Sequence, residues 1–138
     1  MATYNGMNAA GMVVATNMNS TKNDLDRVGR SEVQLVNELL SSVTSLDEAR
    51  QAIASTDHTA AVIMVVSDGP QRQAAVAEIT ANHLAFRELD ATGIAFATNH
   101  FLEASMQEWG VPGGPTESTT ARLRRLEQLL TVGGEDSL

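Results

Sequence analysis

Asn99 has a side-chain type and a position that suit stabilisation of a negatively charged reaction intermediate. It stands in Thr98-Asn99-His100-Phe101, directly after an apolar run over residues 93–97 that predicts a strand. A side chain just beyond a strand end is held by a rigid scaffold, and an asparagine amide there can donate to a developing oxyanion. Asparagine after a strand is also a common turn former, and the spacing leaves both interpretations open.

Arg122 is the second candidate, because it lies beside the apolar stripe of a helix predicted over residues 116–130. On a helical wheel it lies about 50° from the centre of the stripe, whereas Arg124 points away. The stripe consists of Leu123, Leu126, Leu129 and Leu130. A guanidinium at a buried margin needs acceptors or an anionic partner. Alternatively, its stem covers the edge of the core and its charged head reaches solvent.

The remaining reactive side chains do not form a metal site or a complete catalytic set. His58, His83 and His100 lack the i, i+4 pair typical of zinc sites, so we predict no metal and no other cofactor. The absence of cysteine excludes a disulfide, a thiolate ligand and a cysteine nucleophile within these 138 residues. No G-x-S-x-G elbow accompanies His100. Thr3 would become an N-terminal nucleophile only after removal of the two residues before it.

The first part of the chain predicts a strand followed by two helices. Turn-forming residues 5–8 precede a β-branched apolar run over 11–17, which predicts a hairpin or strand entry, and the polar residues 19–30 predict an exposed loop. Apolar residues then recur at helical spacing behind two capping boxes. The boxes are Ser31 with Gln34 and Ser45 with Glu48.

The second part predicts a strand series and a final helix. Apolar runs over 60–66 and 74–79 flank a turn, and runs over 84–86 and 93–97 continue the meander, so we expect four successive strands. Pro and Gly residues mark a loop before the helix at 116–130, and residues 133–138 form a flexible tail. The sequence therefore predicts an α+β fold with helices packed on a largely antiparallel sheet.

Composition and charge limit the classes of partner. With 138 residues and 43% apolar content, the chain can form one core and hence one domain. The net charge of −8, spread without a long acidic run, disfavours nucleic acid. No apolar stretch is long enough for a membrane helix, and the N-terminus lacks the pattern of a signal peptide. We therefore expect no membrane association and a cytoplasmic location.

Four short motifs, in order, carry a resemblance to a known family. Gly6-Met7-Asn8 with Gly11-Met12 resembles G-M-N-x-x-G-L/M, and Asp68-Gly69 followed by the strand ending in Glu78 resembles an aspartate, turn, strand, glutamate hairpin. Thr98-Asn99-His100-Phe101 resembles T-N-H-F, and residues 118–122 resemble S-S/T-T-S/A-R. The ordered set resembles the N-terminal-nucleophile (Ntn) hydrolases of the choloylglycine hydrolase family, closest to the isopenicillin N acyltransferase-like branch.

The resemblance implies an αββα sandwich, of which residues 1–138 would form the central to C-terminal part of one domain. It implies that Asn99 helps form the oxyanion hole and that Arg122 closes the polar network of the active site. Ser118 and Thr120 would lie beside Arg122, and Asn8 would border the substrate. His100 would be a packing residue.

The implied chemistry is cleavage of an amide C–N bond, or transfer of an acyl group from acyl-CoA to an amine, through an acyl-enzyme formed on an N-terminal cysteine. The family nucleophile precedes the G-M-N motif, so the resemblance implies a chain truncated before it. The expected partner is a small amide or acyl substrate. A second hypothesis is an inactive remnant that dimerises through an open sheet edge or an uncovered face. A third is an unrelated α+β binding domain with chance motif matches.

Overall fold

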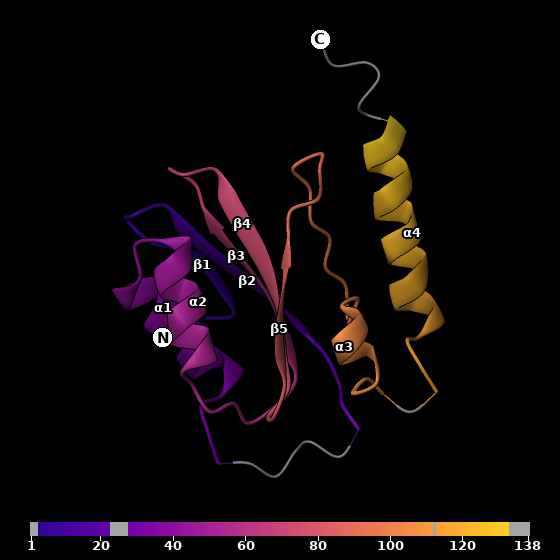
Figure 1. Cartoon of the computed structure of the whole chain (residues 1–138), viewed down its shortest axis with the longest axis horizontal. Helices are drawn as coiled ribbons and strands as arrows, with labels where there is room; N and C mark the ends of the chain where they lie inside the picture. The colour runs from indigo at the N-terminus through magenta and orange to yellow at the C-terminus, as the bar shows by residue number, and fades with distance from the viewer. Residues whose placement is uncertain (1–2, 23–27, 112, 133–138) are drawn as a thin grey trace.

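The computed structural model describes residues 3–22, 28–111 and 113–132. Five strands form one antiparallel sheet in the order β1-β2-β3-β4-β5, so every strand pairs with its neighbour in sequence (Figure 1). The strands are β1 (Asn5–Met7), β2 (Met12–Met18), β3 (Val62–Asp68), β4 (Gln73–Ile79) and β5 (Leu84–Glu88). The helices are α1 (Glu32–Ser42), α2 (Leu46–Ala54), α3 (Ala104–Gln107) and α4 (Glu117–Val132). The predicted tail at 133–138 and residues 23–27 of the predicted loop lie outside the described residues.

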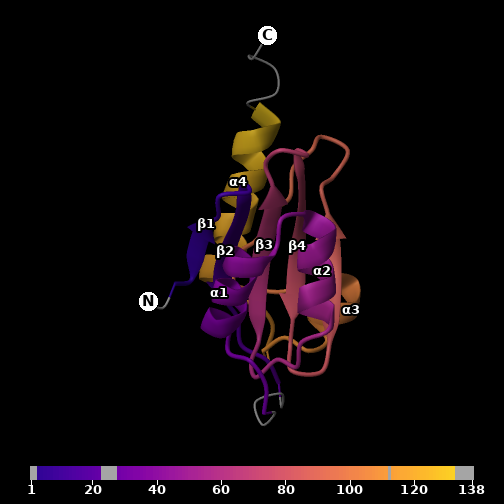
Figure 2. The same cartoon turned by 90° about the vertical axis from the view of Figure 1, so that its left-hand side faces the viewer.

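Helices α1 and α2 cover one face of the sheet (Figure 2). Both begin where the sequence predicts: Ser31 and Gln34 form a complete capping box. Ser45 accepts from the Glu48 amide, and the Glu48 carboxylate accepts from the Thr44 amide 2.7 Å away. Alternate strand residues then bury their side chains against the two helices, because successive side chains of a strand point to opposite faces. This larger core contains Val14, Leu35, Leu39, Ile53, Val62, Met64, Val66 and Ile79.

The opposite face of the sheet is covered by the irregular segment 94–111, which includes α3. A second apolar cluster forms there from Ala61, Ile63, Val76, Phe101 and Met106. The segment is also held through the ring of Trp109, which stacks on His83 with 3.8 Å between ring centroids. The sheet is thus buried on both faces over β3 and β4, as the continuous apolar runs of these strands indicate.

The run 93–97 does not form the fourth strand that the sequence predicts. After β5, Asp90 closes a turn by accepting from the Thr92 and Ile94 amides at 2.8 and 3.0 Å. The chain then crosses the sheet face, where Ala95 and Ala97 pack on the second cluster. An apolar run therefore indicates a buried segment, which can pack on the face of a sheet or pair as a strand within it. The segment 5–8 also differs, since its first three residues form β1 and the turn begins at Asn8.

A buried ion pair anchors this covering segment to the sheet. Glu78 of β4 is fully buried, and Arg87 of β5 donates to its carboxylate from Nε at 2.6 Å. The same carboxylate accepts from the amides of Leu102 and Glu103 at 2.9 and 3.0 Å. Arg87 also donates to the carbonyl of Phe96 at 2.7 Å. One charged pair in the sheet thereby fixes both ends of the segment 96–103.

The α+β class with an antiparallel sheet and packed helices is confirmed, and it is consistent with an Ntn-like sandwich. Among the described residues there is one sheet, not the two of a complete αββα sandwich. Helix α4 lies on the side of the sheet opposite α1 and α2, behind β1 and β2 in the view of Figure 2 (Figures 1 and 2). The later part of its predicted stripe is nevertheless exposed, with relative exposures of 37% at Leu126, 52% at Leu129 and 43% at Leu130.

Replacing Arg87 with methionine should lower the free energy of unfolding by about 3 kcal/mol, because the buried Glu78 carboxylate would lose its cation. Urea denaturation measures this. Arg50→Met is the matched control, since the Arg50 and Glu88 side chains are 29% and 59% exposed and such pairs contribute about 1 kcal/mol or less. Equal losses in the two variants would contradict the anchoring role of Glu78.

Candidate functional site

The side chain of Asn99 is held between the end of β2 and the second turn of α4. Its Nδ2 donates to the carbonyl of Met18 at 2.7 Å, and its Oδ1 accepts from Arg122 Nη2 at 3.0 Å. An amide nitrogen carries two hydrogens, so one donor of Asn99 remains for a ligand. The structure thus brings together the two predicted catalytic residues in a fixed geometry.

Arg122 reaches this contact from an exposed position, which corrects the prediction that it lies at a buried margin. The helical wheel places it beside the leucine stripe, but the stripe does not pack on the sheet. The guanidinium therefore keeps access to solvent while it donates to Asn99. It orients the asparagine, because the bond to Oδ1 fixes which end of the amide presents nitrogen.

Thr119 is a site residue that sequence reasoning missed. Its side chain is 2% exposed, and its hydroxyl accepts from the Asn99 backbone amide at 2.9 Å. The same hydroxyl lies 2.9 Å from His100 Nδ1, which in turn lies 3.0 Å from the hydroxyl of Thr98. These contacts fasten α4 to the segment 98–100. The sequence signal that could have pointed to it is its place in the polar start of the helix, three residues before Arg122.

Burial lowers the pKa of His100 below its ordinary value of 6.5. The nearby Glu78 carboxylate acts in the opposite direction, and the guanidinium groups of Arg122 and Arg87 lower the pKa further. The imidazole is therefore mostly neutral at pH 7. The site contains an amide, two hydroxyls and a neutral ring beside one guanidinium.

The predicted substrate-binding residues lie outside this cluster. Asn8 Oδ1 accepts from the Ala10 and Met12 amides, both at 3.0 Å, and its Nδ2 donates to the Val43 carbonyl at 2.8 Å. Asn8 therefore closes the β1–β2 turn at the start of β2, whereas Asn99 binds the end of that strand. The seven residues of β2 separate the two positions by about 20 Å.

Ser118 and Thr120 flank Thr119 on α4. Within the described residues, neither side chain forms a hydrogen bond with Asn99. Ser118 is exposed. Thr120 donates its hydroxyl to the Thr116 carbonyl of the same helix at 2.9 Å. Because successive helical residues are 100° apart, only the middle residue of the three faces the segment 98–100.

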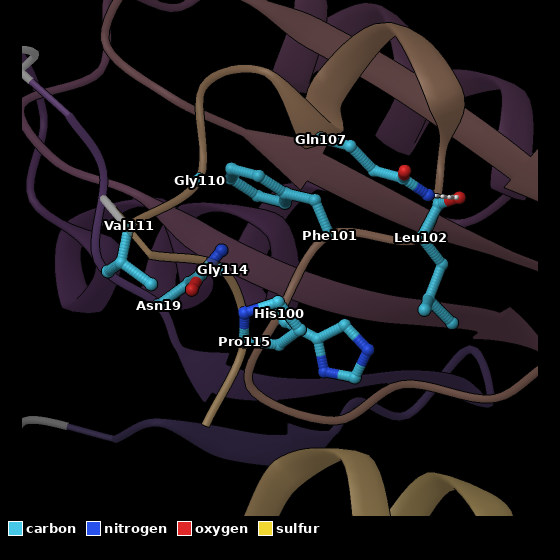
Figure 3. Close-up of a pocket in the computed structure, with 9 residues that line it drawn as sticks. All are labelled: Asn19, His100, Phe101, Leu102, Gln107, Gly110, Val111, Gly114 and Pro115. Carbon is cyan, nitrogen blue, oxygen red and sulfur yellow. Dashed lines mark hydrogen bonds between the residues drawn. The ribbon is translucent and has the colours of Figure 1, made fainter. Parts of the chain in front are cut away.

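Two adjoining cavities open beside Asn99. One, of about 220 Å³, is lined by Met18, Asn19, Ser20, Asn99, Val111, Pro115 and Thr116. The other, of about 330 Å³, is lined by Asn19, His100, Phe101, Leu102, Gln107, Gly110, Val111, Gly114 and Pro115 (Figure 3). Asn19, Val111 and Pro115 line both cavities. A ligand at Asn99 therefore has space continuing toward Phe101 and Leu102.

Residues 3–22, 28–111 and 113–132 contain no group of three or more His, Cys, Asp or Glu side chains arranged to hold a metal ion. No helix of these segments is long and apolar enough to cross a membrane.

The fold and site together define an α+β domain of the Ntn-like type, with an asparagine amide fixed next to a cavity. The family described as acyl-coenzyme A:6-aminopenicillanic acid acyl-transferase matches residues 2–135. Since this match spans nearly all of the sequence, the chain belongs to that family. Comparison with the curated proteins finds no match.

Thr119→Val should lower the free energy of unfolding by about 1–3 kcal/mol, because the Asn99 amide would lose its acceptor in a partly buried place. Thr120→Val is a matched control on the same helix, and it should cost less than about 0.5 kcal/mol, since its hydroxyl bond is local and exposed. Chemical denaturation of both variants measures the difference. Indistinguishable losses would remove Thr119 from the site.

Proposed function

We propose that the chain forms the oxyanion-stabilising part of an acyl-transfer site that acts on a small amide or acyl substrate. The observation that carries the proposal is Asn99, whose amide is fixed by Met18 and Arg122 and retains one free donor beside a cavity. The family match supports the reaction class. Asn99 would donate to the carbonyl oxygen as it gains negative charge, and Arg122 would act by orienting Asn99.

The reaction in this proposal proceeds through a thioester. A cysteine thiolate adds to the substrate carbonyl, and the carbonyl π electrons move to the oxygen that Asn99 binds. Collapse of the tetrahedral intermediate expels an amine, which takes a proton, or the thiol of an acyl-CoA. Water or a second amine then attacks the acyl-enzyme and releases the cysteine. The 138 residues contain no cysteine, so another segment or chain supplies this nucleophile in the proposal.

Three residues inferred from the family resemblance take lesser parts in the proposal. Asn8 shapes the β1–β2 turn at the far end of β2, where both ends of its amide are engaged. Ser118 and Thr120 stand at the open start of α4 and border the approach to Arg122. None of the three is proposed to touch the reacting carbonyl.

Binding of a tetrahedral anion tests Asn99 without requiring turnover. The chain should bind the heptylphosphonic acid monoanilide anion more tightly than octananilide, because the phosphonate mimics the charged intermediate. Asn99→Ala should weaken binding of the anion by about tenfold or more and affect the anilide less. Titration calorimetry of both ligands measures the preference.

Asn37→Ala is the matched control for this experiment, since Asn37 is a partly buried asparagine on α1 that donates to the Val33 carbonyl. Arg124→Ala serves the same purpose for Arg122→Ala, which should reduce the preference for the anion by misorienting Asn99. An anion that binds no better than the anilide, or equal effects of Asn99→Ala and Asn37→Ala, would refute the proposal.

A second candidate is an interaction module that self-associates through α4, and it is favoured by the exposed leucines of that helix. Leu126, Leu129 and Leu130 form an apolar strip that neither face of the sheet covers. Such strips on soluble proteins commonly mark interaction sites. In this second hypothesis the chain retains the fold of the family but does not catalyse acyl transfer.

Sedimentation velocity distinguishes the second candidate from a monomeric acyl-transfer site. If α4 mediates self-association, the wild-type chain should sediment as a dimer at micromolar concentration, and Leu129→Glu should yield a monomer. Val28→Glu is the control, because Val28 is 97% exposed and lies beside Ser55 and Thr56, which follow α2. A wild-type chain that remains monomeric would eliminate this candidate.

A further inference from the structure

We propose that the cavity of about 330 Å³ beside His100 and Phe101 binds an uncharged, mainly apolar acyl group of the substrate, and that Asn19 donates a hydrogen bond to an oxygen of that group. This inference rests on the proposed function, since it places the acyl group relative to Asn99. We call this space the acyl cavity. Figure 3 shows its lining side chains.

The chemistry of the walls selects an uncharged ligand. The apolar wall consists of Phe101, Leu102, Val111 and Pro115, and within the described part of the chain no lysine, arginine, aspartate or glutamate lines the cavity. Among the described lining residues His100 alone carries a titratable side chain, and burial lowers its pKa. A charged ligand group here would lose its hydration without gaining a counter-ion.

The volume of the acyl cavity limits how much of a substrate enters it. Sites for complete small molecules usually measure about 300–1,000 Å³, and this cavity lies at the lower limit of that range. It suits one substituent of a substrate and is too small for a whole acyl-CoA. The highly charged phosphates of CoA also find no complementary charge there.

Asn19 provides the evidence that the cavity takes a ligand with an acceptor atom. Its Oδ1 accepts from the Ser20 amide at 2.9 Å, but its Nδ2 is buried and has no hydrogen-bond partner among residues 3–22, 28–111 and 113–132. A buried donor without an acceptor costs about 1–3 kcal/mol, and a ligand with an acceptor atom would remove that cost. Asn19 lines both cavities, so its side chain lies where the space at Asn99 joins the acyl cavity.

Two anchors hold the walls of the acyl cavity in place before a ligand arrives. The Leu102 amide is bound by the buried Glu78 carboxylate at 2.9 Å. On the other side, Gly110 forms an isolated bridge with Thr21, and the Lys22 amide donates to the Trp109 carbonyl at 3.2 Å. The cavity is thereby tied both to the sheet and to the chain leaving β2. Fixed walls reduce the entropy lost on binding.

Titration with octanamide tests the inference through amide chemical shifts. The proposal expects saturable shifts at Leu102, Gly110 and Val111, and binding of octanamide at least about tenfold tighter than that of octanoate or octylammonium. Val111→Trp should abolish binding by filling the cavity. Val28→Trp, which adds the same side chain at an exposed position, should leave it unchanged. Equal binding of the charged and uncharged ligands would overturn the proposal.

Asn19→Leu distinguishes a ligand-binding role from a structural one. The one oxygen of octanamide is its carbonyl, which has two lone pairs and can accept from Asn19 as well as Asn99. Loss of the bond from Asn19 should weaken octanamide binding about fivefold to tenfold. Because Nδ2 has no partner within the described segments, the free energy of unfolding should stay the same or rise. A variant that loses stability but keeps its affinity would overturn the role of Asn19.

The results separate this inference from the proposed function. Octanamide binding that Val111→Trp abolishes, together with no phosphonate effect of Asn99→Ala, would establish the acyl cavity and reject the oxyanion role. A phosphonate effect of Asn99→Ala without octanamide binding would retain the oxyanion role and overturn the acyl cavity.

Discussion

The buried carboxylate of Glu78 is the constraint on which the arrangement of the site depends. It occupies the sheet face that carries the second apolar cluster, where Arg87 balances its charge and two backbone amides of the segment 102–103 donate hydrogen bonds to it. A well-packed apolar replacement for such a pair is often equally or more stable, so stability does not explain it. What the pair supplies is position, because the carboxylate is satisfied only when this segment crosses the sheet at one place.

The position of Asn99 follows from that crossing and from two further contacts. The segment reaches the end of β2, where the Met18 carbonyl accepts from the asparagine, and it meets α4 through Thr119 and Arg122. Backbone amide, side-chain oxygen and side-chain nitrogen of one residue thus bind three different groups. A side chain restrained in this way is preorganised for a ligand, which lowers the entropy lost on binding.

The sequence predicted local features well and tertiary packing less well. Ser31 and Ser45 identified the starts of α1 and α2, since a cap depends on residues within one turn. The run 93–97 was misassigned because an apolar run indicates burial whether the backbone pairs or not. Asn99 and Arg122 were both singled out and do contact each other. Thr119 was missed, and the burial expected of Arg122 was wrong, because both depend on where α4 lies relative to the sheet.

The contact between Asn99 and Met18 joins residues 81 positions apart, whereas β3, β4 and β5 pair through short turns. Bringing distant segments together costs loop-closure entropy that local hairpins avoid. The sheet has local connections that can form early, while the contacts around Asn99 require much of the chain to be in place. The contacts around Asn99 should also open before the sheet does. A region held by a few long-range polar contacts opens at lower free energy than a packed core. Asn99 is therefore oriented only in the fully folded chain, because its partners come together after the rest of the chain has assembled.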